Sequence, residues 1–267
     1  MGTEAAPERQ MTAGYSEPNE AAVDRTGSGV SAVLLVGGMG TRLRSVVSLT
    51  PKPLAAVGGH SFLELLVQQL RYQGVHRLLM CTGYLADQFE QQFGDGSVSG
   101  IRIEYSRERQ AMGTGGAVKL ASHALQNEAE FLVMNGDSFI EMDFQRLLRF
   151  HREQRAFLSM AVRQVTDTNR YGRVEINDAG RVISFTEKST SNGPGLVNAG
   201  VYVFSRDVLK QIPDGPASLE KDVFPKLLDR GIYAIEQQGM FIDIGTPEDY
   251  AQAQEICGRL YAAALNR

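Results

Sequence analysis

The sequence predicts an α/β fold: a mixed, mainly parallel central sheet flanked by helices, with a small antiparallel extension. From residue 31 onward, short apolar runs typical of strands alternate with amphipathic stretches of helical period. After residue 143 the strand-like runs follow one another too closely for helical crossovers, so antiparallel pairs are expected there. With 267 residues, of which 43% are hydrophobic, the chain can bury the core of one such domain.

The first half of the domain is expected to supply the parallel strands. Strand 32–36 ends in two glycines, and Ser61 with Glu64 forms a capping-box pattern ahead of a helix that should stop at Gly74. The alternation then continues with strands at 77–82, 101–105 and 131–135 and helices at 85–93 and 115–125. Strands separated by helices favour parallel pairing.

The second half is expected to begin with a helix at 144–154 and to continue as the antiparallel extension. The strands predicted there are 157–163, 172–176, 182–187 and 197–204, followed by a helix at 219–229 and a strand at 232–236. Thr246 and Pro247 open a last helix. We therefore divide the chain into a disordered N-terminal extension, residues 1–30, and a single domain, residues 31–267.

Composition excludes several classes of partner. The net charge of −4 gives no long-range attraction to nucleic acid or anionic lipid, and no apolar run is long enough to span a bilayer. Cys81 and Cys257 have neither metal-ligand nor disulfide spacing, so both are expected to be buried and inert, in a reducing cytoplasm. Whether the chain forms a homo-oligomer stays open.

A glycine-rich turn follows the first predicted strand, in the run Gly-Gly-Met-Gly-Thr-Arg-Leu at 37–43, and Pro-Lys-Pro-Leu follows at 51–54. Glycines there let the backbone approach a phosphate chain closely, and Arg42 and Lys52 supply positive charge. An isolated turn of this kind is as often purely structural. It is not a P-loop, which needs Gly-Lys-Ser/Thr, nor a dinucleotide fingerprint, which needs a glycine where Leu43 stands.

This two-part motif resembles the signature of the sugar nucleotidyltransferases, and the resemblance extends from about residue 31 to residue 250. It implies a Rossmann-like fold of the nucleotide-diphospho-sugar transferase type. It also implies that Arg42 and Lys52 are catalytic, binding the triphosphate and stabilising the reacting phosphoryl group. The further residues that the resemblance assigns to the nucleotide are Gly37, Gly38, Gly40, Thr41, Glu108, Gly113 and Thr114.

Two acids are candidate metal ligands. Asp137 lies just beyond a predicted buried strand, and Asp243 lies in the run Phe-Ile-Asp-Ile-Gly-Thr-Pro. Either one alone would more often be a helix cap or a turn residue. In the family resembled, acids at these two places hold Mg²⁺, which commonly takes only one or two protein carboxylates.

The base pocket is expected around residues 105–117. A carboxylate at Glu108 could accept both the N1–H and the 2-amino hydrogens of guanine, although a glutamate in such a basic stretch is equally well interpreted as solvated. Gln110 and Ala111 depart from the family, in which a stretch containing proline is usual.

The sugar phosphate is expected to bind on the antiparallel extension. The resemblance implies that Lys188 meets the phosphate, that Glu187 and Asn198 bond sugar hydroxyls, and that Gly172 allows close approach of the backbone. Residues 31–142 would thus mainly bind the nucleotide and residues 143–250 mainly the sugar phosphate. No histidine is expected to be catalytic, and His60 and His151 are expected on the surface.

The implied reaction transfers a nucleoside monophosphate from an NTP to a sugar 1-phosphate, with release of pyrophosphate. The chain most resembles the D-glycero-D-manno-heptose 1-phosphate guanylyltransferases, which favours GTP as nucleotide and the heptose phosphate as acceptor. Hexose 1-phosphate enzymes that use UTP, dTTP or ATP share the phosphate and metal residues and stay as an alternative. A non-catalytic sugar-nucleotide sensor is a second alternative and a dinucleotide oxidoreductase a weaker third.

Overall fold

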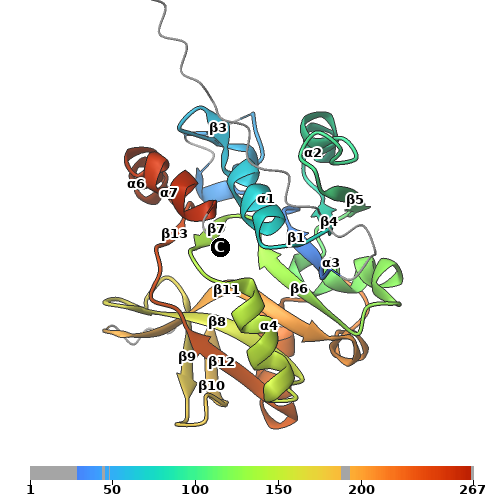
Figure 1. The fold of residues 1–267 in the computed structure, drawn as a ribbon, viewed down its shortest axis with the longest axis vertical. Helices are drawn as coiled ribbons and strands as arrows, with labels where there is room; N and C mark the ends of the chain where they lie inside the picture. Colours follow the sequence, from blue (N-terminus) through green and yellow to red (C-terminus); the bar gives the residue numbers. More distant parts are fainter. Residues whose placement is uncertain (1–28, 44–45, 48, 188–192, 266–267) are drawn as a thin grey trace, which may run out of the picture.

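The computed structural model describes residues 29–43, 46–47, 49–187 and 193–265 (Figure 1). Almost all of the predicted N-terminal extension therefore lies outside the described residues, and so does Lys188. Of the helices in the described ranges, none combines the length and the apolar character needed to cross a bilayer.

Within these ranges a nine-stranded central sheet organises the domain, as predicted (Figure 1). Its main path runs β10-β9-β11-β6-β1-β4-β5, while β8 pairs with β11 and β12. The pairs β6-β1-β4-β5 are parallel, and β11 pairs antiparallel with β6, β8 and β9. The strands are β1 (Ser31–Leu35), β4 (Arg77–Thr82), β5 (Arg102–Arg107), β6 (Glu130–Asn135), β8 (Leu158–Val165), β9 (Gly172–Ile176), β10 (Val182–Glu187), β11 (Gly195–Ser205) and β12 (Ile232–Glu236).

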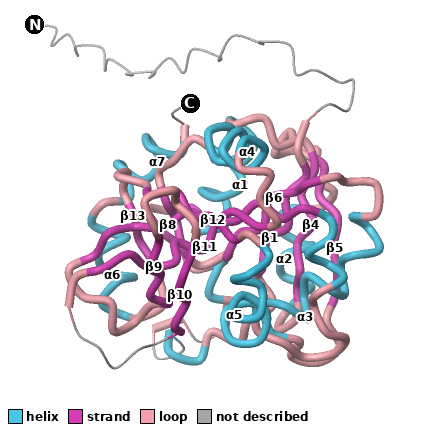
Figure 2. The backbone as a smooth tube through the Cα atoms, turned by 90° about the horizontal axis from the view of Figure 1, so that it is seen from below, coloured by secondary structure: helices cyan, strands magenta, loops and turns pink. Residues whose placement is uncertain are grey.

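Helices cover both faces of the sheet. Figure 2 shows α1 and α4 on one face and α3 and α5 on the other. The alternation along β1 serves both layers, because Ala32 and Leu34 pack into one core and Val33 into the other. The helices are α1 (Phe62–Tyr72), α2 (Ala86–Phe93), α3 (Gly113–Ala121), α4 (Phe144–Glu153), α5 (Phe224–Leu227), α6 (Pro247–Glu255) and α7 (Cys257–Ala264).

Local chemistry explains where these helices begin and break. The Ser61 hydroxyl accepts the Glu64 N–H and the Glu64 carboxylate accepts the Ser61 N–H, so the predicted capping box of α1 is confirmed. The helix predicted at 219–229 is instead a π-helical turn (Leu219–Val223), α5 and a 3₁₀ turn (Leu228–Arg230). Pro225, which has no N–H to donate, lies at the start of α5, where a proline is tolerated.

Two short strand pairs were not predicted. One is the hairpin of β2 (Ala56–Val57) and β3 (His60–Ser61). The other pairs β7 (Ser138–Ile140) antiparallel with β13 (Phe241–Asp243). Strands of two or three residues are too short to show a period, yet the second pair brings together chain segments that carry both candidate metal ligands.

The prediction that His151 lies on the surface is wrong, whereas His60 is exposed as predicted. The His151 residue is only 3% exposed. It continues the apolar stripe of α4 formed by Phe144, Leu147 and Leu148, and that stripe faces the core. The imidazole contacts the Ser159 hydroxyl at 3.0 Å and the Ser205 hydroxyl at 3.1 Å. Burial lowers the pKa of His151 to about 4.

We expect His151 to make the protein less stable as pH falls. The unfolded chain takes up this proton near pH 6.5 and the folded protein only near pH 4, so stability decreases between these values. Such a shift corresponds to about 3 kcal/mol at most. Urea unfolding from pH 7 to pH 4.5 should show a steeper loss in the wild type than in His151→Gln. Parallel curves for the two proteins would contradict burial of a neutral imidazole.

Candidate active site

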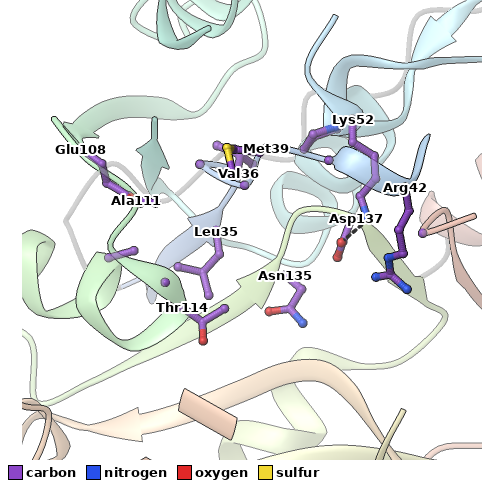
Figure 3. Close-up of a pocket in the computed structure, with 17 residues that line it drawn as sticks. Leu35, Val36, Met39, Arg42, Lys52, Glu108, Ala111, Thr114, Asn135 and Asp137 are labelled. Atoms are coloured by element: carbon purple, nitrogen blue, oxygen red, sulfur yellow. Dashed lines mark hydrogen bonds and ion pairs between the residues drawn. The ribbon is translucent and has the colours of Figure 1, made fainter. Parts of the chain in front are cut away.

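A pocket of about 390 Å³ opens beyond the ends of β1 and β6 (Figure 3). These are carboxyl ends of parallel strands, where open α/β sheets bind ligands. Predicted site residues that line the pocket are Gly37, Gly38, Gly40, Arg42, Lys52, Glu108, Gly113, Thr114 and Asp137. The two candidate catalytic cations therefore share one pocket with the predicted nucleotide residues and one candidate metal ligand.

The glycine-rich loop turns back towards Lys52. Gly40 has a φ of +58°, which favours glycine, and a Cβ there would lie 3.0 Å from the Lys52 Cβ. The next residues form a 3₁₀ helix, Thr41–Leu43, in which Leu43 is buried and Arg42 is exposed towards the pocket. The Lys52 side chain is only 10% exposed and forms an ion pair with Asp137. The ammonium group is thus held in place inside the pocket.

The strands β7 and β13 bring the two aspartates together. Ser138 lies opposite Asp243 in this pair, and the Ile244 N–H donates to the Asp137 carbonyl oxygen at 2.9 Å. Burial, together with the neighbouring Asp137 charge, raises the pKa of Asp243, while the positive charge of Lys52 opposes this. Asp243 itself does not line the pocket, but Gly245, two residues later, does.

The donor set fits a magnesium ion. Among the described residues no group of three or more His, Cys, Asp and Glu side chains could hold a metal. The candidate that the sequence predicted is a pair, Asp137 and Asp243. The Asp243 Oδ1 atom is buried and has no hydrogen-bond partner among the described residues, which leaves a costly unsatisfied acceptor there. Carboxylate oxygens are the ligands that Mg²⁺ prefers, and two of them suffice because water and phosphate oxygens complete its shell.

Glu108 lies at the other end of the pocket from Asp137 (Figure 3). It is half-buried rather than solvated, and its Oε2 accepts the Met112 N–H at 2.9 Å. Burial raises the pKa of this carboxyl. A Cβ on Gly37 would lie 2.7 Å from Glu108 Oε1, so the carboxylate packs directly over this glycine and would have to shift to make room for a larger residue. This close approach fixes the acid against the floor of the pocket.

The start of α3 forms one wall of the pocket through Gly113 and Thr114. Gly113 has a φ of +69°, again a conformation that favours glycine. The N–H groups of Gly115 and Gly116 both donate to the Ala217 carbonyl oxygen, at 2.8 and 3.1 Å. Those two donors of the helix start are therefore already engaged within the protein.

The three predicted sugar residues that the structure describes form a second group on β9, β10 and β11, outside the residues that line the pocket. Gly172 lies opposite Glu187, and a Cβ on Gly172 would lie 3.0 Å from Glu187 Oε2. Asn198 uses its side chain locally: Nδ2 donates to the Tyr202 hydroxyl at 2.6 Å and Oδ1 accepts the Gly200 N–H at 3.1 Å. These bonds cross an irregularity in β11 between Asn198 and Tyr202.

Several lining residues were missed by sequence reasoning. Asn135 could have been found, because it ends β6 two residues before Asp137, and Gly245 belongs to the Asp243 motif itself. The others are apolar or small residues beside strands and loops, which sequence does not distinguish from core positions. They are Leu35, Val36, Met39, Pro53, Ala111 and Ala117.

Comparison with known proteins identifies the class. Residues 31–258 match the nucleotidyl transferase family. The chain therefore belongs to this family.

The relatives include several guanylyltransferases. The chain is 39% identical over 227 residues to mannose-1-phosphate guanylyltransferase of Mycobacterium tuberculosis, covering 84% of this chain and 63% of that protein. It is 36% identical over 228 residues to D-glycero-alpha-D-manno-heptose 1-phosphate guanylyltransferase of Aneurinibacillus thermoaerophilus, covering 85% of this chain and 97% of the relative. The chain thus spans less than two thirds of the mannose relative's length.

A solved structure has the same fold. HddC from Yersinia pseudotuberculosis is 33% identical and superposes with a TM-score of 0.76 over 85% of this chain and 98% of HddC. Its complex with GMP-PN gives a TM-score of 0.75 over the same shares.

We expect Gly37→Ala to weaken nucleotide binding, because the added methyl group would collide with the Glu108 carboxylate. The affinity for a non-hydrolysable GTP analogue should fall about tenfold, which is ~1.4 kcal/mol, as measured by isothermal titration calorimetry. Gly258→Ala in α7 is the matched control, since a Cβ there meets no atom within 4 Å. Unchanged affinity in Gly37→Ala would show that the position of Glu108 does not matter for nucleotide binding.

Proposed function

We propose that this protein transfers GMP from GTP to a sugar 1-phosphate and releases pyrophosphate. The observation that carries the proposal is one pocket lined by Arg42, Lys52 and Asp137 at one end and by Glu108 at the other. Cations suit the triphosphate, and a half-buried carboxylate suits the donor edge of guanine. The names of the guanylyltransferase relatives, and the GMP-PN complex of HddC, support the same choice of nucleotide.

The reaction is an in-line displacement at the α-phosphorus of GTP. An oxygen of the sugar phosphate forms the new P–O bond, the bond to the β-phosphate oxygen breaks, and pyrophosphate leaves with the electron pair. The attacking phosphate is already ionised at neutral pH, because the second pKa of a phosphate monoester lies near 6. The chain therefore does not need to supply a general base.

The chain's own contribution is positioning and neutralisation of charge. Arg42 and Lys52 bind the triphosphate, and Lys188 is proposed to bind the phosphate of the acceptor, so that two anions can approach. The ion pair with Asp137 holds the Lys52 ammonium ready before the nucleotide arrives. Asp137 and Asp243 would hold Mg²⁺, which adds positive charge where the reacting phosphates meet.

Glu108 is proposed to select the base. Its carboxylate can accept the N1–H and the 2-amino hydrogens of guanine together. A base without that pair of donors would leave the half-buried carboxylate with the Met112 N–H alone and would gain no hydrogen bond from it, which costs binding energy. This favours GTP over UTP, dTTP and ATP.

We propose D-glycero-D-manno-heptose 1-phosphate as the acceptor, with mannose 1-phosphate as the second candidate. The heptose enzyme of A. thermoaerophilus matches over 97% of its own length, whereas the mannose enzyme of M. tuberculosis matches over 63% although its identity is 39%. A non-catalytic sensor of the same fold would be expected to lose a phosphate-binding cation or an acid. Arg42, Lys52, Asp137 and Asp243 are all present.

The test is pyrophosphate release with Mg²⁺, measured for each NTP with heptose 1-phosphate, mannose 1-phosphate or glucose 1-phosphate. We expect GTP with the heptose phosphate to give the highest kcat/KM. Release with a different pair would keep the chemistry and replace the proposed substrates. No release with any pair, despite nucleotide binding, would contradict the enzymatic proposal and favour the sensor.

A further inference from the structure

Residues 215–220 form a segment that packs against the start of α3, about a hundred residues earlier in the sequence. The N–H of Ala217 donates to the Met112 carbonyl oxygen at 2.8 Å, and the Ala217 carbonyl oxygen accepts two N–H groups of the first turn of α3. The helix α5, which follows this segment in the chain, lies on the same face of the sheet as α3 (Figure 2). The helix start that forms one wall of the nucleotide pocket is therefore bound to a separate part of the chain.

The glycines of α3 make this contact one of backbone against backbone. A Cβ on Gly113 would lie 2.6 Å from the Ala217 carbonyl oxygen, and a Cβ on Gly116 would lie 2.5 Å from the Gly215 carbonyl oxygen. Both oxygens belong to the backbone, so a side chain at either glycine would force the main chain of residues 215–217 to move. A start of helix so rich in glycine has little conformational preference of its own, so its shape depends on the segment it packs against.

Thr114 is the one residue in this turn whose side chain joins the two parts. Its hydroxyl donates to Glu220 Oε2 at 2.7 Å and accepts the Leu219 N–H at 2.8 Å. The Ser218 hydroxyl donates to the same Glu220 oxygen at 2.8 Å. The carboxylate of Glu220 is thus the shared acceptor that fixes both hydroxyl groups.

The segment is itself held in place by buried side chains in and directly after it. Leu219 and Phe224 are both 0% exposed. The Phe224 ring lies 5.3 Å from that of Phe185 on β10 and 5.2 Å from that of Tyr202 on β11. The strands β10 and β11 carry Glu187 and Asn198, two of the proposed sugar residues. The segment and the helix α5 that follows it therefore link the sugar side of the domain to the nucleotide pocket.

We infer that Glu220 is a positioning residue for the nucleotide: through Thr114 it sets the wall of the pocket formed by Gly113 and Thr114. The inference rests on the proposed function, and it assigns Glu220 no contact with substrate. Without the carboxylate, the Thr114 hydroxyl loses its acceptor, and the bond from the Leu219 N–H is left to tether the glycine-rich turn alone. The pocket then has to be ordered by the nucleotide itself, at the expense of affinity.

The experiment compares Glu220→Ala with Glu220→Gln. Glutamine keeps an oxygen that can accept both hydroxyl groups, so it should retain wild-type behaviour. Alanine should weaken binding of a non-hydrolysable GTP analogue about tenfold, measured by calorimetry, while the KM for the sugar phosphate at saturating GTP changes less than about twofold. Asp222→Ala is the matched control, because Asp222 accepts the Ser218 N–H at 2.8 Å in the same segment. It should leave nucleotide affinity unchanged.

Three results would overturn the inference: unchanged nucleotide affinity in Glu220→Ala, an equal loss in Glu220→Gln, or an equal loss in Asp222→Ala. If Glu220→Ala does not fold, Thr114→Val and Thr114→Ser decide instead, since only the valine variant loses the hydroxyl and should bind the analogue weakly. Equal binding by both Thr114 variants would also overturn it. Failure of the wild type to bind any nucleotide would contradict the proposed function instead, so the two failures are distinguishable.

Discussion

The repulsion between two carboxylates is the constraint around which this site is built. Asp137 and Asp243 come from segments more than a hundred residues apart, and the short pair β7–β13 brings them together. Burial, and after it the charge of Asp137, raises the pKa of Asp243. Lys52 offsets part of this repulsion through its ion pair with Asp137. One oxygen of Asp243 still lacks a hydrogen-bond partner among the described residues, which is consistent with the proposed magnesium site.

Hydrogen bonds from neighbouring elements hold the chain around these acids in place. Two buried glutamines, Gln69 in α1 and Gln73 directly after it, hold the chain that follows Asp137. Gln69 Nε2 donates to the Ile140 carbonyl oxygen at 2.8 Å, and Gln73 Nε2 donates to that of Met142 at 2.7 Å. The Gln73 Oε1 atom accepts the Phe144 N–H at 2.7 Å and so satisfies a donor at the start of α4. The Gln73 amide is thus paired at both its nitrogen and its oxygen, and the two glutamines together tether the chain between β7 and α4. A paired polar group has the same role in the inference for Glu220, whose carboxylate accepts the Thr114 hydroxyl beside the glycine-rich start of α3.

Sequence predicted the parts of the protein that depend on local pattern. The buried parallel strands, the capping box at Ser61 and the glycine-rich turn all have periods or residue types that can be recognised within a few positions. The pair β7–β13 could not be predicted, because three-residue strands have no period and their pairing is set by contacts across the chain. The bond from Thr114 to Glu220 joins residues 106 positions apart and follows no motif. The burial of Glu108 and His151 depends on which elements pack over them, and composition does not specify that.

The measurement that tests this account most directly is Mn²⁺ binding, with Mn²⁺ in place of Mg²⁺, to the nucleotide-free protein by electron paramagnetic resonance. The wild type should bind one ion per chain. Asp137→Asn and Asp243→Asn should each lose this binding while remaining folded, as far-UV circular dichroism would show, because each removes a ligand charge without changing the shape of the side chain. Undiminished Mn²⁺ binding in either folded variant would contradict the claim that the two aspartates form one cation site.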